Sequence, residues 1–207
     1  MSRVLILSPH PDDEAIGCGG TIRAHVLDGD DAHVVFLTSG EKGVAGRDPA
    51  ETAVTREAEA AAAAEILGVT GITFWRLPDG AMRASNSAVQ RLQALLGAWQ
   101  PDYLYVPHGG EQHPDHRAAH RLACRAIENG TVPVVRFYEV WTPLGAMDAI
   151  VDISEHVATK TAAIRAYKSQ CAIMRFDDAA LALNRYRGEM HSWPGGDYAE
   201  VFMERRV

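Results

Sequence analysis

The segment Ser8–Glu14, which reads SPHPDDE, decides both the fold and the function that we expect for this chain. It follows the apolar run Val4–Leu7, which is typical of a strand buried in a parallel sheet. It precedes a segment from Gly19 to Leu27 that is predicted to be helical. One histidine and three carboxylates therefore lie where a strand ends and a helix begins. In an open α/β sheet, this carboxyl edge is where ligands bind.

The residue types in this segment favour a metal site. His10 and Asp13 are three positions apart with Pro11 between them, and a tight turn of this kind can point an imidazole and a carboxylate at one centre. These two groups are suitable ligands for zinc, and also for iron or manganese. The alternative is a capped helix start, with Asp12 or Asp13 as the N-cap and Glu14 in the first turn. That alternative accounts for the acids but not for the histidine.

A second cluster, Pro107–His116 (PHGGEQHPDH), follows another apolar run at Tyr103–Val106. Strands and helices alternate along the chain, which predicts an α/β fold: a Rossmann-like, mostly parallel sheet with helices on both faces. In this strand order the runs at residues 4–7 and 103–106 lie side by side, at the topological switch point. The two clusters are therefore expected to meet, and two His-Pro-Asp turns at one gap are hard to explain without a metal.

Our hypothesis is that His10, Asp13 and His116 bind one zinc ion and leave an open position for water, which is the pattern of a catalytic site. Fe²⁺ suits the same ligand set. Water bound to such a metal has its pKa lowered to about 7. This chemistry is hydrolysis of an amide, an ester or a similar bond.

Three further side chains of the clusters have expected catalytic roles. Asp12 is adjacent to the ligands and free, so it is the natural general base. A protonated His113 would stabilise the developing oxyanion. Asp115 would orient an imidazole, for which we expect His113.

Composition restricts the class of protein. The chain has 207 residues, which suits a single domain spanning 1–207, and its net charge of −7 makes nucleic acid an improbable partner. Its three widely spaced cysteines argue against a disulfide framework, and we find neither a signal peptide nor an apolar run long enough for a membrane span. These features predict a cytoplasmic protein, and formation of a homo-oligomer is compatible with them; a small-molecule substrate is expected from the site and not from composition.

The two clusters resemble those of the PIG-L/LmbE-type zinc N-deacetylases, through Pro-His-Pro-Asp-Asp-Glu with a following Gly-Gly-Thr and through His-Pro-Asp-His downstream. Weaker matches are Arg56-Glu57, Leu77-Pro78-Asp79 and the segment Tyr198–Phe202. The resemblance implies removal of an N-acetyl group from an N-acetylglucosaminyl or related amino-sugar conjugate. An amidase that cuts a larger acyl group from a thiol or amino-sugar conjugate is the alternative with the same site.

The resemblance also implies roles for individual residues. His10, Asp13 and His116 would be the zinc ligands, with Asp12 as the base and His113 as the oxyanion stabiliser or acid. Arg56 and Asp79 look like the family's sugar-binding pair; the alternative is an arginine on a helix surface and an aspartate in a turn. Some members have a tyrosine near the second cluster that aids the oxyanion, and this chain has Glu111 at that place.

Overall fold

The computed structural model describes residues 1–127, 130, 132–191 and 196–206. Its strands are β1 (Arg3–Ser8), β2 (Asp31–Phe36), β3 (Gly71–Phe74), β4 (Tyr103–Pro107), β5 (Val134–Tyr138), β6 (Ala149–Asp152) and β7 (Ala199–Arg206). Its helices are α1 (Asp13–Leu27), α2 (Pro49–Leu67), α3 (Asn86–Trp99), α4 (Pro114–Ala126), α5 (Val157–Ala166), α6 (Lys168–Cys171) and α7 (Phe176–His191), with a 3₁₀ turn at Ser154–His156.

The strands form a seven-stranded sheet in the order β3-β2-β1-β4-β5-β7-β6. Strands β1 to β5 are parallel, and β7 pairs antiparallel with both β5 and β6. The predicted α/β fold is confirmed, as is the pairing of β1 with β4 at the point where the chain reverses its direction across the sheet. Both polar clusters therefore reach the same carboxyl edge.

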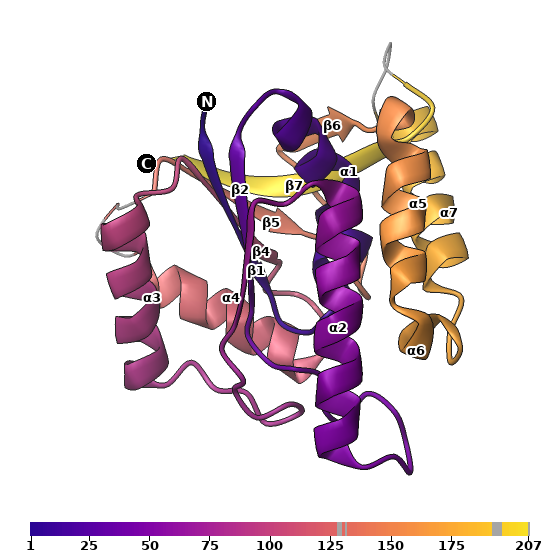
Figure 1. Cartoon of the computed structure of the whole chain (residues 1–207). Helices are drawn as coiled ribbons and strands as arrows, with labels where there is room; N and C mark the ends of the chain where they lie inside the picture. The colour runs from indigo at the N-terminus through magenta and orange to yellow at the C-terminus, as the bar shows by residue number, and fades with distance from the viewer. Residues whose placement is uncertain (128–129, 131, 192–195, 207) are drawn as a thin grey trace.

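Helices cover both faces of the sheet (Figure 1): α3 and α4 pack on one face, and α1, α2, α5 and α7 on the other. Strand β1 contributes to both layers, because successive side chains of a strand point to opposite faces. Leu5 and Leu7 belong to the core under α3 and α4, whereas Val4 and Ile6 belong to the core on the other face. Burial on both faces explains why this strand is a continuous apolar run.

Helix α1 is kinked at Cys18, whose φ of −144° and ψ of 23° are not helical. In an unbroken helix the N–H of Gly20 would donate to the carbonyl of Ile16. Here the N–H of Gly20 donates to Glu200 (2.9 Å), while the carbonyl of Ile16 accepts from the ammonium of Lys160 (2.8 Å). Lys160 and Glu200 are fully buried and lie 2.6 Å apart, so one ion pair satisfies the backbone groups at the kink.

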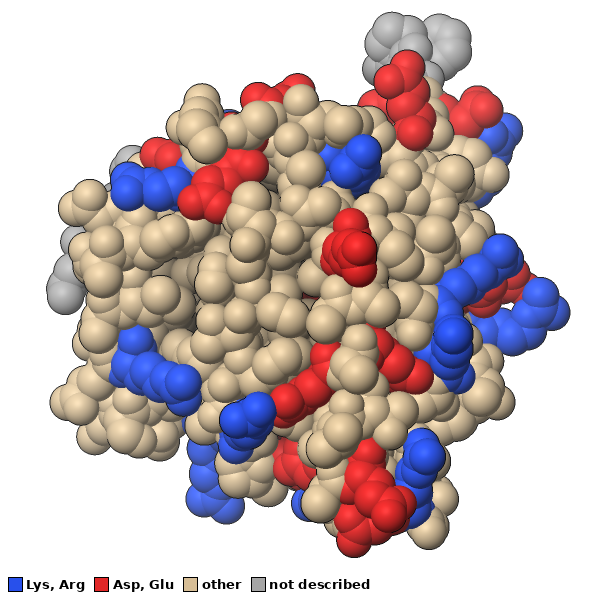
Figure 2. All heavy atoms as spheres, in the orientation of Figure 1, with Lys and Arg blue, Asp and Glu red and all other residues tan. Residues whose placement is uncertain are grey.

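The surface carries charges of both signs. On the face shown in Figure 2, Lys and Arg side chains are scattered among Asp and Glu side chains rather than gathered in one basic patch. Within the described ranges, no helix is both long enough and apolar enough to cross a bilayer.

Candidate active site

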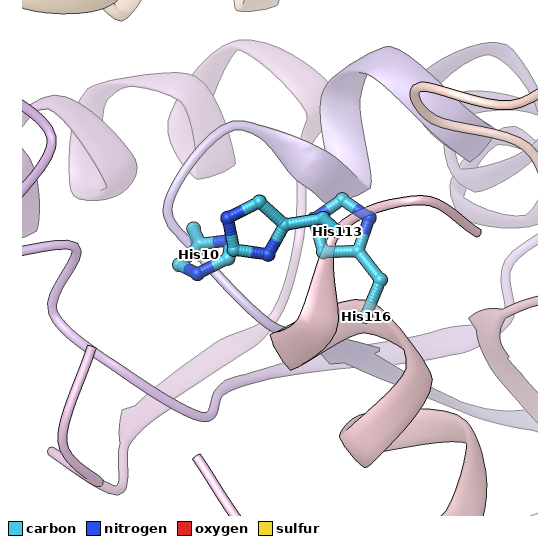
Figure 3. A group of neighbouring side chains, drawn as sticks. All are labelled: His10, His113 and His116. Atoms are coloured by element: carbon cyan, nitrogen blue, oxygen red, sulfur yellow. The ribbon is translucent and has the colours of Figure 1, made fainter. Parts of the chain in front are cut away.

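The turn after β1 and the start of α4 bring six predicted site residues together at the switch point. The Asp13 carboxylate is central: its Oδ2 lies 3.1 Å from Nδ1 of His10 and 3.2 Å from Nε2 of His116. The ring of His113 lies 4.8 Å from that of His10 and 4.8 Å from that of His116. Figure 3 shows these three imidazoles gathered between the turn after β1 and the start of α4.

In the part of the chain that the structure describes, two sets of side chains have donor atoms close enough together to hold a metal ion: His10, His113 and His116, and also His10, Asp79 and Asp115. Both sets contain His10 and neither contains Asp13. Nδ1 of His10 faces Asp13, while its Nε2 lies 3.2 Å from Oδ1 of Asp79. Nitrogen and carboxylate donors around one point are the ligands that zinc and ferrous iron accept. The structure therefore contains a possible metal site that includes His10.

One nitrogen of the His116 ring, Nε2, indicates where a metal ion could bind. Among the described residues this buried Nε2 has no hydrogen-bond partner, although Oδ2 of Asp13 is only 3.2 Å away. Two atoms bonded to one tetrahedral zinc at about 2.0–2.1 Å lie about 3.3–3.4 Å from each other. The spacing of Asp13 and His116 fits a shared cation.

Glu111 orients His116, a role that the sequence analysis missed. Its carboxylate is buried, lies 3.3 Å from Nδ1 of His116, and accepts the backbone N–H groups of Val140 (2.8 Å) and Trp141 (3.1 Å). Burial raises the pKa of Glu111, but hydrogen bonds from His108, His116 and Val140 outweigh it and lower the pKa to about 2. The permanent carboxylate fixes the ring with Nε2 toward Asp13. An acid five residues before a histidine, across a turn, was the only available signal in the sequence.

Asp115 has a different partner from the one we expected. Its Oδ2 lies 3.2 Å from Nε2 of His10 and accepts the N–H of Gly80 (2.7 Å). The prediction that this carboxylate orients His113 is therefore corrected: it orients His10. The reason is geometric, since the first turn of α4 points Asp115 toward the loop after β3, and that loop donates its N–H groups to the carboxylate.

His113 caps helix α4 with its own ring. Nδ1 of His113 accepts the N–H of Asp115 (3.3 Å), so the neutral ring carries its proton on Nε2. Burial lowers the pKa of His113, and the neighbouring His10 and His116 lower it further. With Nδ1 occupied as an acceptor, a neutral His113 ring still offers its Nε2–H as a donor, so the oxyanion role expected for it does not require the protonated ring.

Asp12 lies beside the candidate metal site in a strained backbone. Its φ of 133° is in a region that residues other than glycine rarely adopt, and such strain persists where the surroundings enforce it, often at functional sites. Burial raises the pKa of its carboxyl to about 7, against the opposing effect of Arg56, whose guanidinium is 3.1 Å away. Asp12 is thus a carboxylate next to the candidate ligands with no hydrogen bond to their rings among the described residues.

Arg56 and Asp79 both reach this centre. Arg56 is buried and its guanidinium also donates to the carbonyls of Pro11 and Gly40, so it is not a surface arginine. Asp79 accepts the backbone N–H of Lys42 (2.8 Å), which ties the loop after β2 to the loop after β3. Arg56 and Asp79 open, together with the three histidines of the centre, onto a cleft of about 300 Å³. The cleft is lined by His10, Asp12, Asp13, Lys42, Gly43, Arg56, Asp79, Gly80, His113, His116, Trp141, Gln170, Ile173, Met174 and Phe176.

Residues 5–127 match the model of the PIG-L family, described as GlcNAc-PI de-N-acetylase. A 1D-myo-inositol 2-acetamido-2-deoxy-alpha-D-glucopyranoside deacetylase of Mycobacterium sp. (strain KMS) is 31% identical, over 83% of this chain and 75% of that protein.

Two solved structures share the fold over nearly the whole chain. The N,N'-diacetylchitobiose deacetylase of Pyrococcus horikoshii matches with a TM-score of 0.87 and 26% identity, covering 99% of this chain and 84% of its own. The 4-carboxy-2-hydroxymuconate hydratase GalB of Pseudomonas putida KT2440 matches with a TM-score of 0.88 and 26% identity, covering 100% of this chain and 98% of its own. The same fold thus serves deacetylases and a hydratase.

Proposed function

Because the chain belongs to the PIG-L (GlcNAc-PI de-N-acetylase) family, we propose that it is a metal-dependent N-deacetylase acting on an N-acetylglucosaminyl or related amino-sugar conjugate. The observation that carries the proposal is the position of the Asp13 carboxylate, which lies between Nδ1 of His10 and Nε2 of His116, an atom with no hydrogen bond among the described residues. We assign His10, Asp13 and His116 as the metal ligands. Zn²⁺ suits these ligands, as does Fe²⁺, and when bound supplies Lewis acidity that polarises a carbonyl and acidifies water.

The remaining side chains of the site transfer the proton, stabilise the oxyanion and hold the imidazole rings in place. Asp12 accepts a proton from the water that attacks the acetamide carbon, and the neutral His113 donates its Nε2–H to the oxyanion. As the C–N bond breaks, the proton held by Asp12 passes to the leaving nitrogen. The immediate products are acetic acid and the neutral amine, and transfer of the acid proton to the amine gives acetate and the ammonium form of the amino sugar, so atoms and protons balance. Asp115 and Glu111 hold the rings of His10 and His116.

Arg56 and Asp79 are proposed to bind the sugar. Both open onto the cleft, where the guanidinium donates hydrogen bonds and the carboxylate accepts them from hydroxyl groups. Their backbone-anchored positions supply the fixed geometry that discrimination between sugars requires.

We expect the protein loaded with Zn²⁺ or Fe²⁺ to release acetate from N-acetylglucosaminyl conjugates, and the chelated protein to release none. Acetate is measured enzymatically, with metal content determined in parallel. Matched substrates that carry a larger acyl group on the same nitrogen test the amidase alternative. Faster release of the larger acyl group would favour that alternative.

A second candidate is addition of water to a double bond of an unsaturated tricarboxylate, because a hydratase shares the fold over nearly its whole length. The cations of Lys42 and Arg56, both in the cleft, could receive the carboxylates. The decisive comparison uses 4-carboxy-2-hydroxymuconate, whose conjugated system absorbs ultraviolet light. Loss of that absorbance, without acetate release from any amino sugar, would replace the deacetylase proposal.

Replacing Glu111 by Gln is expected to weaken metal binding about 10- to 100-fold, the usual effect of removing a group that orients a ligating histidine. The amide keeps the size of the side chain but removes the charge that faces Nδ1 of His116. Affinity is measured by competition with a chromogenic chelator. Glu57→Gln is the control, because Glu57 bonds Ser39 and Arg76 and touches no proposed ligand. Equal losses in both variants, or unchanged affinity in Glu111→Gln, would contradict the role.

A further inference from the structure

One wall of the cleft consists of large apolar side chains that remain exposed to solvent. Trp141 is 43% exposed, Ile173 is 58% exposed and Met174 is 49% exposed, and Phe176 lies beside them with its ring 6.4 Å from that of Trp141. We call these four residues the apolar shelf; all of them line the cleft. A contiguous apolar patch of this kind next to convergent polar groups is typical of a ligand site rather than of an ordinary surface.

The outer part of the shelf is held in place without belonging to the core. In the described part of the chain, neither Ile173 nor Met174 is a member of the two core clusters. Their backbone N–H groups both donate to the carbonyl of Gln170, at 2.9 and 3.0 Å, and the N–H of Phe176 donates to the carbonyl of Met174 (2.9 Å). The turn between α6 and α7 therefore presents two large apolar side chains to water in a defined conformation.

The inner part of the shelf is fixed to the catalytic centre. The backbone N–H of Trp141 donates to the carboxylate of Glu111, which also faces His116. The ring of Trp141 lies 5.8 Å from that of His113. The shelf thus begins beside the reacting groups and runs outward, while Arg56 and Asp79 provide a polar wall to the same cleft.

We propose that the substrate carries an apolar aglycone, an alkyl or aryl group, which lies on the apolar shelf while the amino sugar occupies the polar part of the cleft. The inference rests on the proposed deacetylase function and specifies its substrate class. A sugar ring could stack on Trp141, but Ile173 and Met174 offer no strong donor or acceptor to a hydroxyl-rich aglycone such as inositol or a second sugar. Their burial becomes favourable only if the group laid on them is itself apolar.

The test compares the β-N-acetylglucosaminides of methanol, octanol (below its micelle-forming concentration) and phenol. We expect kcat/KM for the octyl and phenyl glycosides to exceed that for the methyl glycoside by about tenfold or more, since covering one large apolar side chain is worth at least that. Met174→Ser and Ile173→Ser should each reduce the ratio of kcat/KM for the octyl or phenyl glycoside to kcat/KM for the methyl glycoside. Met190→Ser is the matched control: Met190 is 61% exposed on α7 but does not line the cleft, so the ratio should stay at its original value.

A binding measurement separates this inference from the proposed function. Calorimetric Kd values for the same glycosides with the metal-loaded Asp12→Asn protein should show the same preference without turnover. Acetate release from all three glycosides with equal kcat/KM and equal Kd would contradict the proposed role of the apolar shelf, and the proposed deacetylase function would stand. Absence of acetate release from every glycoside would contradict the proposed deacetylase function. The Kd values of the octyl and phenyl glycosides, compared with that of the methyl glycoside, would still decide whether the apolar shelf binds apolar groups. A ratio that Met174→Ser and Ile173→Ser leave unchanged would also overturn the shelf.

Discussion

Replacing Asp12 by Asn is expected to lower kcat about 10²- to 10⁴-fold, the usual contribution of a general base, while the protein stays folded and keeps its metal. The amide cannot accept the proton of the attacking water. It has nearly the same size as the carboxylate, and asparagine is among the residues most tolerant of a positive φ, which position 12 requires. The measurements are acetate release, metal content and far-ultraviolet circular dichroism on the same preparation.

Asp13→Asn is the matched comparison, since it makes the same chemical change one residue away. Oδ2 of Asp13 lies within 3.2 Å of ring nitrogens of both His10 and His116, whereas the charged partner of Asp12 is Arg56. Asp13→Asn should therefore lose metal and activity together, and Asp12→Asn should lose activity alone. Loss of metal from both variants would make Asp12 a ligand, and full activity of the metal-loaded Asp12→Asn protein would remove its role as base.

The fold was predictable because the information that determines it is local. A strand buried on both faces must be apolar throughout, and the run Val4–Leu7 meets that condition in both cores. Alternation of strands and helices then restricts the order of a parallel sheet, which is why the adjacency of β1 and β4 followed from the sequence. The position of β7 between β5 and β6 was not predictable, because an antiparallel insertion at the edge depends on long-range packing.

The site was predictable in its members but not in its connections. The two His-Pro-Asp turns identify the residues that meet, since the chain direction fixes which ends of the strands they follow. Which carboxylate faces which ring depends on side-chain directions: Asp115 bonds His10 rather than His113, and Glu111 bonds His116. Glu14, the third acid of the first cluster, turns away from the cleft to bond Ser8 and Tyr167. The spacing of the residues in the sequence does not predict any of these hydrogen-bond partners.

The kink in α1 is a further feature with no local signal. Gly19 and Gly20 suggest a weak helix, but the partners that stabilise the break lie far along the chain, on α5 and β7. The kink sets the course of the helix whose first turn contains Asp13, so the ion pair between Lys160 and Glu200 supports the geometry of the site from a distance.

Replacing Lys160 by Met should therefore destabilise the protein strongly, by about 3–5 kcal/mol in the free energy of unfolding, the range found when one partner of a buried ion pair is removed. The Glu200 carboxylate would remain buried without its cation, and the carbonyl of Ile16 would lose its donor. The free energy of unfolding is measured by urea denaturation followed by far-ultraviolet circular dichroism.

Three further variants test the cause of this loss: Arg165→Met, Glu200→Gln and the double variant Lys160→Met/Glu200→Gln. Arg165→Met removes an arginine on the same helix whose ion pair with Asp177 is exposed, so it should change stability far less, because solvent screens such pairs. In the double variant Lys160→Met/Glu200→Gln the uncompensated charge is gone, and its loss of stability should be smaller than the sum of the two single losses. Additive losses would mean that the charges act independently. A loss in Lys160→Met no larger than that in Arg165→Met would mean that the kink in α1 does not depend on the buried pair.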